Sequence, residues 1–181
     1  GAAYAGALAR LRSAGLAYPC FCSRAEIARA VEAPHASDEG PCYPGTCRDL
    51  PEAVRESRAA RRPPAWRFRV PEERVEVEDR VHGKCSFDVA ASVGDFVVAR
   101  ADGVAAYQLA VAVDDAAMGV TDVVRGDDLL PSAARQLLLY RALGLPAWDT
   151  DGIGLLPDWG DGPETDEGKA ARLGAPVAIH F

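Results

Sequence analysis

The stretch that decides the fold is residues 95–146, DFVVARADGVAAYQLAVAVDDAAMGVTDVVRGDDLLPSAARQLLLYRALGLP. Its first half predicts two strands around an Ala-Asp-Gly turn at 101–103, a typical hairpin signal. The second of these strands ends in the unbroken apolar run Leu109–Val113, which is typical of a strand buried on both faces. Asp114 and Asp115 follow at the predicted end of that strand, where they either contact a ligand or close a turn.

The second half of the stretch predicts a strand and then a helix. Residues 120–130 contain the strand and the beginning of the helix, and residues 131–145 contain the most strongly patterned helix of the chain. Pro131 lies in its first turn and Gly144 is its C-cap, which is the usual asymmetry of helix ends. Strands that alternate with helices predict an α/β domain.

Upstream of this stretch the apolar spacing changes along the chain. Residues 4–16 have helical spacing, and residues 50–60 predict a second, short helix. Ser23 and Glu26 form a predicted capping box for a helix over residues 25–33. The Pro- and Gly-rich residues 34–49 predict a loop. Residues 66–71 and 74–81 alternate apolar with charged residues and predict half-buried strands, whereas residues 146–181 are weakly patterned.

Composition excludes several classes of protein. No apolar run approaches the length of a membrane helix, and Arg10 and Arg12 follow the first apolar residues instead of preceding them, so we expect a cytoplasmic protein without a secretory signal. The net charge of −7 argues against non-specific attachment to nucleic acid. Six arginines still fall within 55–69, and they form either a solvated face or a local phosphate-binding strip: Arg55, Arg58, Arg61, Arg62, Arg67 and Arg69.

Four of the five cysteines gather within 28 positions, at Cys20, Cys22, Cys42 and Cys47. In a reducing compartment this spacing favours a metal site over disulfides, and zinc prefers thiolates drawn from two short clusters. The alternative is that the thiols pack as small apolar groups. The fourth ligand is open, because Cys42 would complete four thiolates and Tyr43 would add a phenolate.

Four stretches of the chain resemble the glutamyl-Q tRNA(Asp) synthetases, relatives of the glutamyl-tRNA synthetase catalytic domain. The stretches are YPCFCSRAEI at 18–27, CYPGTCRDL at 42–50, the segment 95–146 and GAPVAI at 174–179. The resemblance implies an incomplete Rossmann-like class I aminoacyl-tRNA synthetase core with a small zinc-binding insertion. It places the zinc ligands at Cys20, Cys22, Tyr43 and Cys47. It also implies four regions: a core helix at 1–17, the zinc module at 18–62, the remaining core at 63–148 and an ATP-loop region at 149–181.

The same resemblance implies that a monomer activates glutamate with ATP and Mg²⁺ and transfers it to queuosine of tRNA(Asp). It places glutamate contacts at Tyr107 and Arg125, both expected at or just beyond strand ends, where open α/β sheets bind ligands. An arginine offers a bidentate fork to a carboxylate, and a tyrosine hydroxyl can bind the amino acid. The alternatives are a core tyrosine and a surface ion pair between Arg125 and Asp127 or Asp128.

The two ATP motifs of class I synthetases are weak in this sequence. No His-x-Gly-His-like turn occurs, and the chain begins with Gly1, so we expect the natural start to lie upstream. Lys169 and Arg172 occupy the place of the Lys-Leu-Ser-Lys-like loop and are the predicted ATP contacts. We therefore expect these 181 residues alone to be inactive. A catalytically dead paralogue that binds glutamate or tRNA, and a zinc-stabilised interaction domain, are the alternatives.

Overall fold

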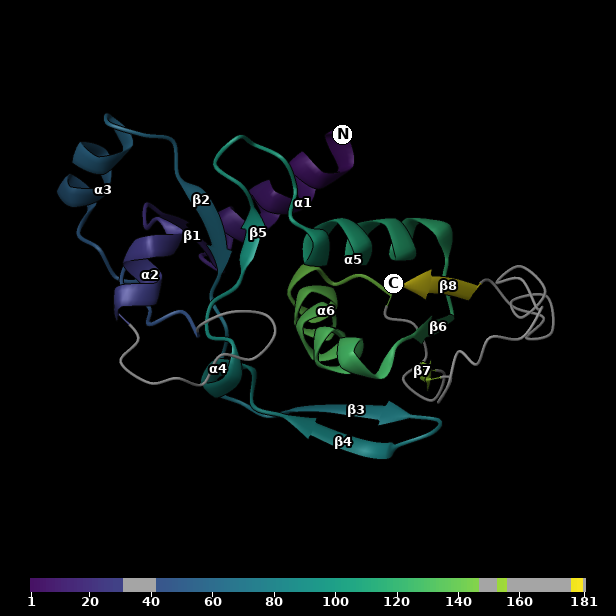
Figure 1. Cartoon of the computed structure of the whole chain (residues 1–181). Helices are drawn as coiled ribbons and strands as arrows, with labels where there is room; N and C mark the ends of the chain where they lie inside the picture. Colours follow the sequence, from purple (N-terminus) through teal and green to yellow (C-terminus); the bar gives the residue numbers. More distant parts are fainter. Residues whose placement is uncertain (31–41, 147–152, 156–176, 181) are drawn as a thin grey trace. The chain divides into compact units, whose positions relative to one another are not determined.

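A computed structural model describes residues 1–30, 42–146, 153–155 and 177–180 (Figure 1). The chain forms two compact units, and each is assembled from two stretches of sequence. The first unit contains residues 1–73 and 88–110, and the second contains residues 74–87 and 111–181. Each unit combines helices with a β-sheet, so the expected mixture of helices and sheets is confirmed. The parallel pairings typical of an α/β fold lie in the second unit, whereas the sheet of the first unit is antiparallel.

The first unit has a three-stranded antiparallel sheet of order β1-β2-β5. In the pairing of β1 with β2, Tyr18 lies opposite Arg67 and Cys20 lies opposite Ala65. The register between β2 and β5 slips by one residue between Trp66 and Arg67. The strands are β1 (Ala17–Cys20), β2 (Ala65–Phe68) and β5 (Val97–Ala99), and the helices are α1 (Ala2–Ser13), α2 (Arg24–Ala30), α3 (Glu52–Ala59) and α4 (Val89–Ser92).

Local signals explain the helix ends of the first unit. The capping box of α2 is confirmed, because the Ser23 amide donates to the Glu26 carboxylate at 2.6 Å and the Glu26 amide donates to the Ser23 hydroxyl at 3.2 Å. The Asp88 side chain accepts from the Ala91 amide at 2.9 Å and so caps α4. Gly15, which follows α1, has a φ of +71°. The predicted helices at 4–16 and 50–60 are therefore both present, with ends shifted by one to three residues.

The second unit has a five-stranded sheet of order β4-β3-β7-β6-β8. Strands β3 and β4 form an antiparallel hairpin, and the other pairings are parallel. Sequence reasoning missed β4, β7 and β8. The strands are β3 (Val75–Asp79), β4 (Gly83–Phe87), β6 (Asp122–Arg125), β7 (Ile153–Leu155) and β8 (Val177–His180), accompanied by the 3-10 turn η1 (Asp127–Leu129) and helix α6 (Leu130–Leu143).

Helix α6 follows its sequence signals closely. Pro131 lies in the first turn, and Gly144 ends the helix in the left-handed conformation with a φ of +55°. Its amide donates to the Arg141 carbonyl at 3.2 Å, which satisfies one of the last carbonyls of the helix. Most of its residues are buried, so α6 is a core element of its unit. The prediction for residues 131–145 is confirmed.

The predicted strand over Leu109–Val113 is wrong. These residues lie in helix α5 (Tyr107–Met118), and Asp114 and Asp115 therefore lie inside a helix instead of at a strand end. Leu109 and Ala112 are fully buried three positions apart, which is helical and not strand spacing. The turn at 101–103 is present, since Arg100 donates its amide to the Val104 carbonyl at 2.8 Å, but its second arm passes directly into α5. None of the described helices combines the length and the apolar composition needed to cross a bilayer.

Candidate functional site

Three cysteine thiols meet in the first unit. Cys20 ends β1, Cys22 follows two residues later, and Cys47 comes from the turn at 46–49. Their three sulfur atoms all lie within 4.8 Å of one another, and the sulfurs of Cys22 and Cys47 are 3.5 Å apart. Cys20 and Cys47 are buried. Thiols gathered this closely from two separate chain segments are the donor arrangement that zinc prefers.

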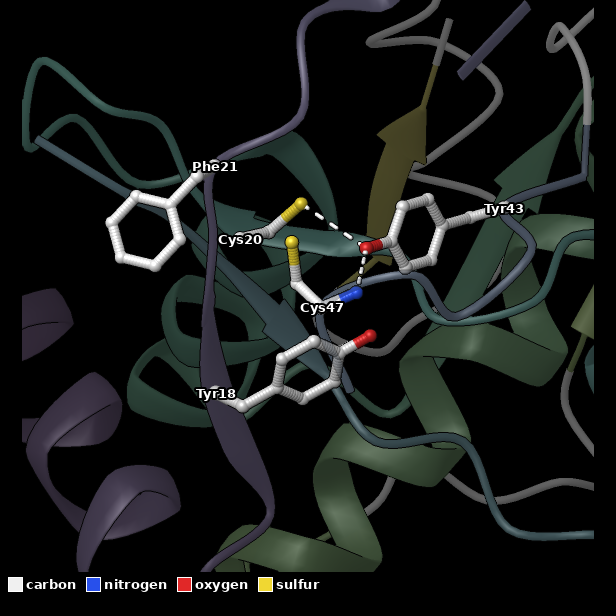
Figure 2. Packing of buried hydrophobic residues seen from close by; sticks show 5 residues of the cluster. All are labelled: Tyr18, Cys20, Phe21, Tyr43 and Cys47. Carbon is white, nitrogen blue, oxygen red and sulfur yellow. Dashed lines mark hydrogen bonds between the residues drawn. The ribbon is translucent and has the colours of Figure 1, made fainter. Parts of the chain in front are cut away.

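The hydroxyl of Tyr43 points into the same cluster (Figure 2). Its oxygen lies 3.4 Å from the Cys20 sulfur and 3.8 Å from the Cys22 sulfur, and it accepts the Cys47 amide at 2.9 Å. Cys42 lies elsewhere, because its sulfur contacts the Ala90 carbonyl at 3.9 Å. Of the two residues considered from sequence for the fourth donor, Tyr43 is the one that faces the three thiols.

Gly94 positions Tyr43. The two residues form an isolated parallel bridge, and the Tyr43 amide donates to the Val93 carbonyl at 3.0 Å. Gly94 has a φ of +69°, and a Cβ atom built on it would lie only 2.5 Å from the Tyr43 carbonyl oxygen. Only glycine therefore fits at this position without displacing the backbone of the tyrosine.

Two guanidinium groups reach the sulfur atoms. The Nε of Arg67 donates to the Cys20 sulfur at 3.3 Å, and an Nη1 of Arg58 approaches the Cys47 sulfur at 3.7 Å. The Arg67 guanidinium also lies over the Tyr43 ring, 3.8 Å from its centroid. Metals bind cysteine as the thiolate, and guanidinium groups at these distances would compensate the negative charge of metal-bound sulfur.

Asp95 links three residues around the cysteine cluster through hydrogen bonds. Its carboxylate accepts the Tyr18 hydroxyl at 2.6 Å, the Val70 amide at 2.8 Å and Nη1 of Arg48 at 3.1 Å. Burial, followed by this hydrogen bond to Asp95, raises the pKa of Tyr18 above its usual range. The Asp95 side chain, at 1% exposure, is thus a buried charge satisfied by several donors, which is how buried carboxylates are tolerated.

The protonation of the cluster depends on burial and on mutual contacts. Burial, followed by the charge of Cys20, raises the pKa of the Cys22 thiol to about 12. Burial, followed by the hydrogen bond with Cys20, raises the pKa of the Tyr43 phenol. For Cys47 burial opposes ionisation, but hydrogen bonds from the Phe21 backbone and the neighbouring side chains outweigh it and lower the pKa. A metal ion would replace the protons of these groups, so the four donors fit zinc in number and chemical type.

Arg125 and Tyr107, the predicted glutamate contacts, lie in different units. Arg125 is the last residue of β6, is 1% exposed, and donates from Nη2 to the Gln136 amide oxygen at 3.0 Å. Its expected place at the end of a strand is confirmed. Tyr107 is 46% exposed and begins helix α5, so its predicted place at a strand end is wrong. The alternatives of a core tyrosine and a surface arginine are also contradicted by these exposures.

The remaining candidate residues divide into two groups. Lys169 and Arg172 lie outside the described residues. The arginine-rich stretch 55–69 is not a uniform basic surface, because several of its members face protein groups. Arg55 pairs with Glu52 at 3.6 Å, and Arg69 pairs with Asp49 at 3.0 Å and donates to the Arg48 carbonyl. These contacts favour a structural over a phosphate-binding role for that stretch.

Comparison with known sequences identifies the family. The family described as tRNA synthetases class I (E and Q), catalytic domain, matches residues 2–151. The chain belongs to this family. The described helices and sheets are those of a class I tRNA synthetase catalytic domain, which agrees with the predicted core.

Three members of this class I synthetase family illustrate the similarity. The glutamyl-Q tRNA(Asp) synthetase of Symbiobacterium thermophilum is 55% identical over 145 residues, which cover 79% of this chain and 45% of that protein. Glutamate--tRNA ligase 1 of Halorhodospira halophila is 49% identical over 149 residues, covering 81% and 31% respectively. A crystal structure of a glutamate tRNA ligase from Elizabethkingia meningosepticum, in complex with its amino acid, superposes with a TM-score of 0.69 at 26% identity, covering 93% of this chain and 36% of that one.

The resemblance to glutamyl-Q tRNA(Asp) synthetases is thus confirmed, and the chain spans less than half the length of these class I synthetases. Sequence reasoning missed the supporting roles of four residues at the candidate sites: Arg67, Gly94, Asp95 and Gln136. A glycine directly before an aspartate in a short turn was the available signal for Gly94 and Asp95. The hydrogen-bonding roles of Arg67 and Gln136 depend on pairing between distant segments, which no local pattern shows.

Proposed function

We propose that this chain takes part in the ATP-dependent activation of glutamate and its transfer to tRNA, with queuosine of tRNA(Asp) as the acceptor. The class I glutamyl and glutaminyl family match supports glutamyl transfer. The acceptor is supported by relatives named glutamyl-Q tRNA(Asp) synthetase, which are about half identical to this chain over four fifths of its length. In this reaction the glutamate α-carboxylate attacks the α-phosphate of ATP and pyrophosphate leaves, which gives glutamyl adenylate. A hydroxyl of the tRNA then attacks the activated carbonyl carbon, takes the glutamyl group and releases AMP.

The observation that carries the proposal is Arg125 at the carboxyl end of the parallel strand β6. Open α/β sheets bind ligands beyond this edge of their strands. The planar guanidinium can bind a glutamate carboxylate through two parallel hydrogen bonds, and the Gln136 contact at 3.0 Å restricts its orientation. Tyr107 remains a predicted glutamate contact in this proposal, and Lys169 and Arg172 remain the predicted contacts of ATP with its Mg²⁺.

The metal centre has a structural role in this proposal. One Zn²⁺ is held by Cys20, Cys22, Tyr43 and Cys47 and joins the end of β1 to the segment 42–50. These metal bonds stabilise a polar segment that has little apolar core of its own. The zinc supplies these cross-links and no chemical step. The residues themselves already bring the two segments together through the contacts of the Tyr43 hydroxyl.

Calorimetry tests the glutamate site directly. The chain is titrated with glutamate, with aspartate and with a non-hydrolysable glutamyl-adenylate analogue. Loss of a hydrogen bond to a charged group costs about 1.5–3 kcal/mol, so Arg125→Ala is expected to weaken binding of the analogue about 10- to 150-fold. Tyr107→Phe changes an exposed residue and is expected to weaken it about 2- to 10-fold. Arg74→Ala, directly before β3 in the same unit, is the control arginine substitution.

The outcomes separate the candidate functions. Binding that is lost in Arg125→Ala but kept in Arg74→Ala supports the glutamate site, and ATP–pyrophosphate exchange dependent on glutamate supports activation. Binding without exchange in this chain favours a binding module. Wild-type protein that binds neither glutamate nor the analogue contradicts the proposal. Arg125→Lys, which keeps the buried charge, shows whether a loss in the alanine variant reflects misfolding.

A further inference from the structure

Arg67 contacts both a cysteine and the tyrosine of the candidate metal centre. We propose that Arg67, assisted by Arg58, is a positioning residue of the metal centre, which compensates the negative charge of its ligands and holds the Tyr43 ring in place. The proposal rests on the metal centre described under the proposed function. It adds an outer layer of charged residues to the four donors.

The charge of the four donors explains why the metal centre needs positively charged neighbours. Three thiolates and one phenolate carry four negative charges, and Zn²⁺ neutralises two of them. The remaining charge lies among buried side chains, since Cys20, Tyr43 and Cys47 are each 5% exposed or less. An uncompensated charge in such surroundings is costly. The two guanidinium groups that approach the sulfurs carry the two positive charges that are needed.

The sheet register brings Arg67 to the centre. Arg67 lies opposite Tyr18 in the β1–β2 pair, and Cys20 is two residues from Tyr18 and so shares its face. Three contacts then hold the guanidinium. Its Nε donates to the Cys20 sulfur at 3.3 Å, its Nη1 donates to the Asp95 carbonyl, and its plane covers the Tyr43 ring at 3.8 Å. One side chain therefore touches two of the four donors and is itself anchored by the backbone.

Arg58 approaches the centre from another element. It lies in the last turn of α3, and its Nη1 is 3.7 Å from the Cys47 sulfur. The two arginines therefore contact different sulfur atoms and come from different elements, β2 and α3. This distribution is expected if each balances part of the charge, because a guanidinium hydrogen bond to a thiolate is charge-assisted and acts over a short range.

Arg69 provides a matched control on the same face of the sheet. It follows β2 by one residue and lies over the ring of Tyr18 at 5.3 Å, as Arg67 lies over Tyr43. It also makes hydrogen bonds, to Asp49 and to the Arg48 carbonyl, at 3.0 and 2.8 Å. None of these contacts involves a cysteine sulfur. A general loss of packing would affect both arginine positions, whereas a role at the metal centre affects Arg67 alone.

The experiment measures zinc affinity by competition with a chromophoric chelator in the full chain. Removal of an outer contact of a metal ligand typically lowers affinity 10- to 100-fold, so we expect a loss in this range for Arg67→Gln and a smaller loss for Arg58→Gln. Arg67→Lys keeps the charge and is expected to recover part of the affinity. Arg69→Gln is expected to bind zinc like the wild type. Co²⁺ substituted for zinc reports the geometry, and its visible bands are expected to shift in Arg67→Gln only.

Three results overturn the inference, each in a recognisable way. Equal zinc affinity and an unchanged Co²⁺ spectrum in Arg67→Gln overturn it while leaving the metal centre intact. An equal loss in Arg67→Gln and Arg69→Gln assigns Arg67 to folding alone. Wild-type protein that binds no stoichiometric zinc removes the metal centre and this inference together, while glutamate binding in the same preparation leaves the proposed transfer function standing. Arg58→Gln, a change on a surface helix, provides the result if Arg67→Gln does not fold.

Discussion

Gly94→Ala should destabilise the first unit and displace Tyr43 from the three thiols. A non-glycine residue in the left-handed conformation costs about 1–2 kcal/mol. The new Cβ would also lie 2.5 Å from the Tyr43 carbonyl oxygen and 3.3 Å from the Cys42 sulfur. Because the first of these neighbours is backbone, the clash requires a chain shift, and such overpacking costs a further 1–3 kcal/mol, roughly. We expect a total loss of about 2–5 kcal/mol in the free energy of unfolding.

Gly15→Ala separates the two contributions. Gly15 has a φ of +71°, close to the +69° of Gly94, but a Cβ at Gly15 meets nothing within 4 Å. Urea denaturation of both variants should therefore show a loss of only about 1–2 kcal/mol in Gly15→Ala. Zinc affinity should fall in Gly94→Ala and remain unchanged in Gly15→Ala. Equal losses of stability in the two variants, with equal zinc affinity, would refute the assignment of Gly94 as the residue that positions Tyr43.

Three further predictions concern other parts of the chain. Removal of metal by a chelator should increase hydrogen exchange at residues 42–50 and leave α6 protected, and metal analysis of untreated protein should find about one zinc per chain. Gln136→Leu removes the acceptor of the 3.0 Å bond from Arg125 and should lower stability by about 1–3 kcal/mol in urea, whereas Gln136→Glu keeps the acceptor and should lose less. The backbone and side-chain hydrogen bonds from Ser23 lower the pKa of Glu26, so this capping contact stabilises α2 above the ordinary glutamate pKa of 4.5 and is lost as the pH falls through the lowered value. NMR titration should show the pKa of Glu26 rising in Ser23→Ala, and an unchanged titration midpoint would contradict the capping contact.

The elements predicted correctly from sequence are those whose ends carry local signals. Helix α6 has Pro131 and Gly144, and helix α2 has the Ser23–Glu26 box, so neither depends on distant partners. The run Leu109–Val113 was predicted wrongly, because a short apolar run is equally compatible with a buried strand and a buried helix. The alanines of this segment favour a helix. In the structure Gln108, Leu109 and Ala112 are buried, which is helical spacing that a run of apolar residues does not reveal.

The missed strands depend on long-range pairing. β7 and β8 are short, and their register is set by β6, which pairs with both in parallel. β4 is a hairpin partner of β3, but its turn is organised by the buried Asp79 carboxylate, which accepts the Val81 and His82 amides, and not by a typical Asn-Gly pair. At the candidate metal centre, the spacing of the cysteines is visible in the sequence. The contacts of Arg67, Gly94 and Asp95 that support this centre form only in the folded chain, so they are not visible in the sequence.

The two interleaved units have a consequence for biosynthesis. The chain passes from one unit to the other after residues 73, 87 and 110, so no single proteolytic cut releases either unit whole. During translation the β3–β4 hairpin leaves the ribosome long before β7, the strand that pairs with β3, has been made. An isolated hairpin is only marginally stable in water. We therefore expect the hydrogen-bonding edge of β3 to stay unpaired and exposed until the later strands emerge. Arrested nascent chains that end near residue 115 would therefore be the most vulnerable to aggregation and to proteases.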